Sequence, residues 1–132
     1  MTKKEKAALV LERKILRAIE AGEFTPVIGY LRTVMYDPYL GRELQLGPCG
    51  CLLAGAASVC GLEGSADQET LIEYLGRHGL GRRDALLLEG GYEGYLDSEL
   101  FGVQGVAKHT NPYFHVGQRL RRFHPHSGGE VG

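Results

Sequence analysis

The strongest constraint on the fold is the run CGCLLAGAASVC, residues 49–60, because it is apolar or small on every side. A helix of this kind has no polar face to turn toward water, so other elements have to enclose it. The run has about a dozen residues, whereas a helix that spans a bilayer needs about 20. These features predict a mainly α fold, a compact small helical domain around a buried central helix at about residues 50–60.

Several segments with helical spacing of apolar residues flank this central helix. The expected helices are 4–21, 25–36, 65–79, 80–91 and 111–124. Their predicted start signals are Thr25-Pro26, a capping box of Ser65 and Gln68, and Asn111-Pro112. Their predicted stops include Gly22 and the pair Gly90-Gly91. Residues 37–48 alternate weakly between apolar and polar and are compatible with one small β-hairpin or a loop.

Length and composition favour one globular domain. The chain has 132 residues, of which 43% are hydrophobic and 23% charged, with a net charge of −1. These values are typical of a folded globule with no strong field to attract nucleic acid or membrane. We expect a single domain at residues 1–124 and a flexible tail at 125–132. Charged residues interrupt the first apolar stretch, so we expect no signal peptide, a cytoplasmic location and no membrane partner.

Three cysteines leave a choice between burial, metal binding and catalysis. Cys49 and Cys51 lie at the start of the central helix and Cys60 at its end. One residue between paired cysteines is fewer than structural zinc sites use, and Cys60 lies a full helix away. We therefore expect buried, inert thiols, no metal, no cofactor and no enzymatic activity. A zinc site of Cys49 and Cys51 with two histidines stays open as an alternative. The candidate histidines are His109, His115, His124 and His126.

An acidic, tyrosine-bearing stretch is the first candidate for a binding surface. Residues 61–105 carry three arginines against nine Asp and Glu, and the acidic residues there alternate with aromatic ones. Such a surface steers a basic protein partner and offers aromatic contact area. The predicted partner-binding residues are Asp84, Glu89, Tyr92, Glu93, Tyr95, Asp97 and Glu99.

A basic cluster in the last predicted helix is the rival surface. Arg119, Arg121 and Arg122 could contact phosphates, which makes a nucleic-acid-binding regulator the alternative function. Cations in the last turn of a helix also complement its dipole, so the cluster has a structural explanation as well.

Two segments, AIEAGEFTPVIGYLRT and LGPCGCLLAGAASVCGL, resemble a group of small phage and prophage proteins. Gly22, Phe24, Leu31 and Arg32 match the first motif of that group, and the cysteine-containing run matches its "CCLGVLCdL" box loosely. The resemblance implies a phage setting and no particular chemistry. We therefore expect a small non-enzymatic interaction protein that binds and modulates a host protein complex, such as the transcription or defence machinery.

Overall fold

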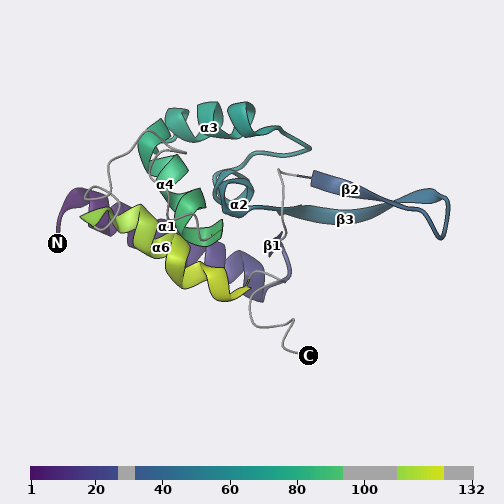
Figure 1. Ribbon diagram of the computed structural model, residues 1–132, viewed down its shortest axis with the longest axis horizontal. Helices are drawn as coiled ribbons and strands as arrows, with labels where there is room; N and C mark the ends of the chain where they lie inside the picture. Colours follow the sequence, from purple (N-terminus) through teal and green to yellow (C-terminus); the bar gives the residue numbers. More distant parts are fainter. Residues whose placement is uncertain (27–31, 94–109, 124–132) are drawn as a thin grey trace.

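A computed structural model describes residues 1–26, 32–93 and 110–123. For residues 32–37 and 43–48 it describes the backbone only. Helices form a compact body, and a β-hairpin projects from one end of it (Figure 1). In chain order the elements are α1 (Lys3–Glu20), β1 (Thr25–Pro26), β2 (Arg32–Asp37), β3 (Arg42–Gly50), α2 (Leu52–Val59), α3 (Gln68–Arg77), α4 (Arg82–Glu93), α6 (Pro112–Leu120) and the 3-10 turn η2 (Arg121–Phe123). The predicted mainly α fold with one small hairpin is confirmed. The predicted tail, 125–132, lies outside the described residues.

Helix α2 is the buried centre of the body, as predicted. Its first six residues, Leu52 to Ala57, are all buried. α1, α3, α4, β1 and β3 all contact it, which gives this wholly apolar helix the enclosure that it needs. Gly55 lets the ring of Phe24 approach: a Cβ at this position would lie 2.8 Å from Phe24 Cε2.

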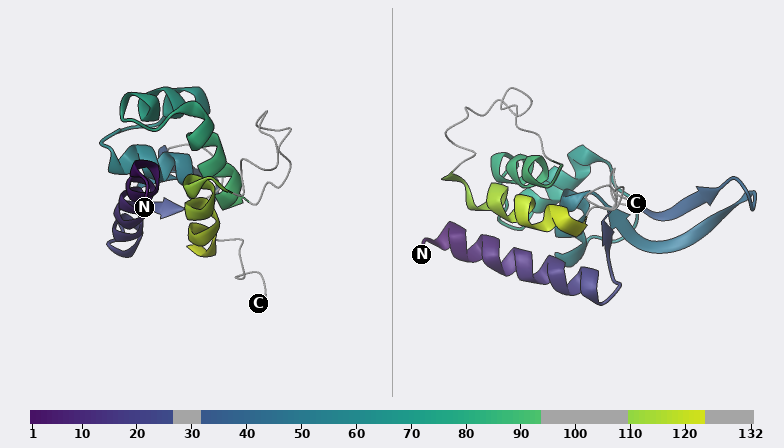
Figure 2. Two further views of the ribbon diagram at one scale, coloured as in Figure 1. Left: turned by 90° about the vertical axis from the view of Figure 1, so that its left-hand side faces the viewer. Right: turned by 60° about the horizontal axis from the view of Figure 1, so that its bottom comes forward.

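Helices α1 and α6 lie side by side along one face of the body (Figure 2). Thr2 and Glu5 form a capping box at the start of α1, and Gly22 follows the helix with φ 74°. Asn111 caps α6 as predicted, and its side chain accepts hydrogen bonds from the backbone amides of Tyr113 and Phe114. Local sequence signals therefore placed both helices correctly.

The predicted helix at residues 25–36 is wrong. Thr25–Pro26 is instead a short strand, β1, which pairs in parallel with Cys49 and Gly50 of β3. Residues 32–37 form β2, which pairs antiparallel with β3, so the strand order is β1-β3-β2. Thr33, Val34 and Tyr36 favour a pleated strand, and proline is tolerated at a sheet edge such as β1. The rest of the predicted helix, 27–31, lies outside the described residues.

The hairpin of β2 and β3 is longer than the predicted one at residues 37–48. Its last register pairs are Tyr36 with Glu43 and Asp37 with Arg42. Residues 38–41 make the connection, which we call the hairpin tip, and Gly41 adopts φ 65° there. β3 leads directly into Cys51, the N-cap of α2, so the hairpin is anchored to the buried centre of the protein.

Two further predicted boundaries differ from the structure. Asp67, not Ser65, caps α3, and its side chain accepts a hydrogen bond from the amide of Thr70 at 2.8 Å. Helix α4 continues through Gly90 and Gly91, where a break was predicted. Gly91 serves tertiary packing rather than helix termination, because α6 lies so close that a side chain there would collide with its backbone.

Within the described residues, no helix is both long and apolar enough to cross a bilayer.

Candidate functional site

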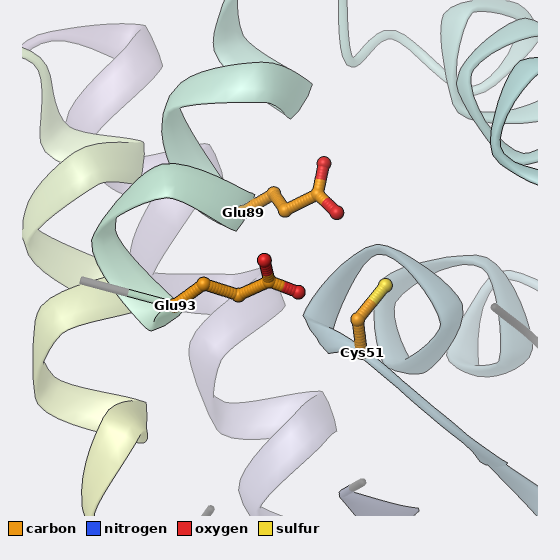
Figure 3. A group of neighbouring side chains, drawn as sticks. All are labelled: Cys51, Glu89 and Glu93. Carbon is orange, nitrogen blue, oxygen red and sulfur yellow. The ribbon is translucent and has the colours of Figure 1, made fainter. Parts of the chain in front are cut away.

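Three side chains that can bind a metal or a proton meet where α4 approaches the start of α2. We call Cys51, Glu89 and Glu93 the thiol–carboxylate cluster. Their ligand atoms all lie within 4.8 Å of one another. Figure 3 shows both carboxyl groups and the sulfur directed into the space between the two helices. Among the described residues, this is the one such group of three His, Cys, Asp or Glu side chains.

Each member is positioned by a simple feature of the secondary structure. Glu89 and Glu93 are four residues apart on α4, so they lie on one face of that helix, one turn from each other. Cys51 is the N-cap of α2, where the chain leaves β3 and enters the helix. The contact between α2 and α4 brings the three together.

The cluster is closed on one side and open on the other. Cys51 is 1% exposed and Glu89 7% exposed, whereas Glu93 is half-buried. Glu89 is the one charged residue that is buried among those described. Its carboxylate accepts a hydrogen bond from Gln68 Nε2 of α3 at 3.2 Å. Solvent therefore reaches the cluster from the Glu93 side.

Burial shifts the proton equilibria of the cluster. Loss of hydration and then the charge of Glu93 raise the pKa of Glu89 to about 7, so this carboxyl titrates near neutral pH. Loss of hydration and then the charge of Glu89 raise the pKa of the Cys51 thiol to about 12. The thiol is therefore neutral at physiological pH. A neutral thiol is a poor nucleophile, which argues against cysteine catalysis by the protein alone.

The other cysteines lie apart from this cluster. Cys49 is buried in β3, and Cys60 is half-buried at the C-cap of α2. The zinc alternative from the sequence required histidines beside Cys49 and Cys51. His115 lies on α6 within 3.3 Å of the Gln118 side-chain oxygen, and His109, His124 and His126 lie outside the described residues.

Two of the described acidic residues that were expected to bind a partner, Asp84 and Glu89, are engaged in contacts within the protein. Asp84 forms an ion pair with Lys4 at 3.3 Å and accepts a hydrogen bond from Asn111 at 2.8 Å. Tyr92 is 1% exposed and Glu89 is also buried, so a partner cannot reach either of them in this conformation. Tyr95, Asp97 and Glu99 lie outside the described residues, and partner binding there stays a prediction.

The basic cluster is divided. Arg119 forms a bidentate pair with Glu12 of α1, with contacts of 2.8 and 2.7 Å, so it joins α6 to α1. Arg121 and Arg122 are exposed in η2, and the guanidinium of Arg122 lies 4.8 Å from the ring centre of Phe123. All three arginines are therefore exposed, and Arg119 is at the same time held in the ion pair with Glu12.

The sequence reasoning missed two features. The first is the carboxylate pair Glu89 and Glu93. Their spacing of four residues indicated that both lie on one helical face, but nothing in the sequence indicated that Cys51 lies beside them. The second is the hairpin tip, where Tyr39 is 97% exposed and Leu40 57% exposed. Its signal was an apolar pair between Pro38 and Gly41, two residues typical of turns.

No protein-family model, no curated protein and no solved structure matches the chain.

Proposed function

We propose that the protein is a non-enzymatic interaction protein that binds another protein through its hairpin tip. The observation that carries this proposal is the exposure of Tyr39 and Leu40, two large apolar side chains next to each other at the end of a projecting hairpin. Exposed tyrosine beside an aliphatic residue is typical of the centre of a protein interface, and tyrosine is enriched among residues that dominate binding energy. The fitting partner has an apolar hollow that takes these two side chains.

The way in which the hairpin is held also supports this role. β3 pairs with β1 along its inner end and continues into the N-cap of the buried helix α2. The pairing of β2 with β3 reaches Asp37 and Arg42 beside the tip, so paired strands join the tip to the buried part of the molecule. A preorganised tip loses little conformational entropy on binding, which favours affinity.

The sequence resemblance supplies the proposed setting. We place the protein in the cytoplasm of a phage-infected host cell, with a host protein complex of the transcription or defence machinery as its partner. The neutral Cys51 thiol supports a role without catalysis.

A pull-down with matched variants tests the proposal. The tip variant carries Tyr39→Ser and Leu40→Ser, and the control carries Val10→Ser, which removes an apolar side chain that is 49% exposed on α1. We expect wild type and control to retain the same host protein and the tip variant to lose it. With the purified partner, the tip variant should bind at least about tenfold more weakly, as loss of an interface tyrosine commonly causes.

Two further charge variants identify the surface if the tip is not the one used. Glu93→Lys with Asp97→Lys changes the acidic region, and Arg121→Glu with Arg122→Glu changes the basic one. Partner binding that survives the tip variant and is abolished by either charge pair refutes the proposal. Release of bound nucleic acid by the arginine changes would instead favour the nucleic-acid-binding regulator.

A further inference from the structure

The thiol–carboxylate cluster has the composition of a metal site, and it belongs to no part of the hairpin tip. We propose that Cys51, Glu89 and Glu93 bind one zinc-type divalent cation, with the thiolate of Cys51 and one carboxylate oxygen from each glutamate as ligands. The cation would join the start of α2 to the last turn of α4.

The geometry fits such an ion with small adjustments. Zinc binds sulfur at about 2.3 Å and carboxylate oxygen at about 2.0–2.2 Å, which places tetrahedral ligand atoms about 3.6 Å apart. The three ligand atoms already lie within 4.8 Å of one another. Rotation about the side-chain bonds of the two glutamates covers the remaining distance of about 1 Å. Water at the half-exposed Glu93 side completes the four ligands, and the ion enters from that side.

Charge provides an argument that is separate from the distances. A buried carboxylate is costly unless a cation or several hydrogen-bond donors compensate it. The described partners of Glu89 are Gln68 and Cys51, both neutral, and the neighbouring Glu93 adds a like charge. A divalent cation placed between the two carboxylates converts their repulsion into attraction. Helix α4 thus presents a pair of like charges that a bound cation would stabilise.

The donor set selects the kind of metal. Magnesium and calcium prefer all-oxygen sites, whereas a thiolate favours softer ions such as zinc. Zinc or cobalt displaces the thiol proton of Cys51 as the metal–sulfur bond forms, and that proton leaves to solvent. Because binding releases this proton, affinity rises with pH. The expectation of no metal considered only cysteine spacing and histidines, and it did not include carboxylates from α4.

Cobalt(II) titration of the chelator-treated protein tests the site, because a cobalt–thiolate bond gives a charge-transfer absorption that carboxylate ligation lacks. We expect one cobalt per chain with this absorption, displaced by zinc. Cys51→Ser should abolish the absorption, and Glu89→Gln or Glu93→Gln should weaken binding by at least about tenfold. Cys60→Ser is the matched control, since it removes the thiol at the other end of the same helix, and it should bind normally.

Three outcomes overturn the proposal: no stoichiometric binding to wild type, an unchanged absorption in Cys51→Ser, or its loss in the Cys60→Ser control. Circular dichroism on each variant checks the fold. If Cys51→Ser fails to fold, Glu93→Gln decides, because Glu93 is only half-buried and its replacement preserves shape. Unchanged cobalt affinity in folded Glu93→Gln then refutes the site. The pull-down with the tip variants is independent of all these results.

Discussion

Replacement of Gly91 by alanine should disrupt the contact between α4 and α6. A Cβ on Gly91 would lie 2.2 Å from the carbonyl oxygen of Phe114 and 3.0 Å from the amide nitrogen of Gln118, whereas ordinary contact begins at 3.4 Å. Gly117 meets α4 in the same way, at 2.2 Å from the carbonyl oxygen of Leu88. Both obstacles are backbone, so no side-chain rotation relieves the collision. The two helices have to move apart by about 1 Å.

The loss of folding stability follows from the gap that this separation opens between α4 and α6. Leu88, Tyr92, Val116 and Leu120 are buried on these two helices, and a gap of about 1 Å removes up to about half of the dispersion energy across such a contact. An extra methyl group that collides with backbone typically lowers the free energy of unfolding by about 1–3 kcal/mol or more. Alanine in place of glycine raises it by up to about 1 kcal/mol, because alanine has the higher helix propensity. We expect a net loss of about 1–2 kcal/mol, which lowers Tm by roughly 5 °C in a domain of this size.

Thermal and urea denaturation followed by circular dichroism measure this effect. Gly76→Ala is the matched control, because Gly76 is an exposed residue of α3 and its added Cβ would meet nothing within 4 Å. The control should be as stable as wild type or slightly more stable. Gly91→Ala combined with Gly117→Ala should lose less than the sum of the single losses, since one separation accommodates both methyl groups. A Gly91→Ala protein as stable as the Gly76→Ala control would refute the close packing of α4 and α6.

Two further predictions concern ionisable groups. In the folded metal-free protein, a thiol reagent should modify half-buried Cys60 first and buried Cys49 and Cys51 only slowly, whereas all three thiols should react fast in denaturant. Rapid modification of Cys51 at neutral pH would contradict its pKa of about 12. Folding raises the pKa of Glu89 from 4.5 to about 7, so between pH 4.5 and 7 the folded protein holds a proton that unfolding releases. The free energy of unfolding should therefore fall as pH rises from about 4.5 to 7 and level off above 7. This fall is at most about 3 kcal/mol. Glu89→Gln should remove it, as measured by urea denaturation of the metal-free protein at several pH values. If the stability of the variant depends on pH as that of wild type does, other groups cause the effect.

The sequence by itself determined the elements whose signals are local. The capping side chain of Asn111, the glycine after α1 and the apolar circumference of residues 49–60 each act within a few residues, so they predicted α6, α1 and α2 correctly. The same local signals failed at residues 25–36, because a strand exists only where another strand accepts its hydrogen bonds, and that partner is β3.

Tertiary structure alone decided the close contacts. Gly90-Gly91 resembles a helix stop in the sequence, yet α4 continues through it. Gly91 instead leaves room for the backbone of α6, which occupies the space that a side chain would need. The spacing of Glu89 and Glu93 placed them on one helical face, but only the packing of α4 on α2 brought Cys51 to them. Burial then raised the pKa of Glu89, because hydration is lost through contacts between elements that lie far apart in the chain.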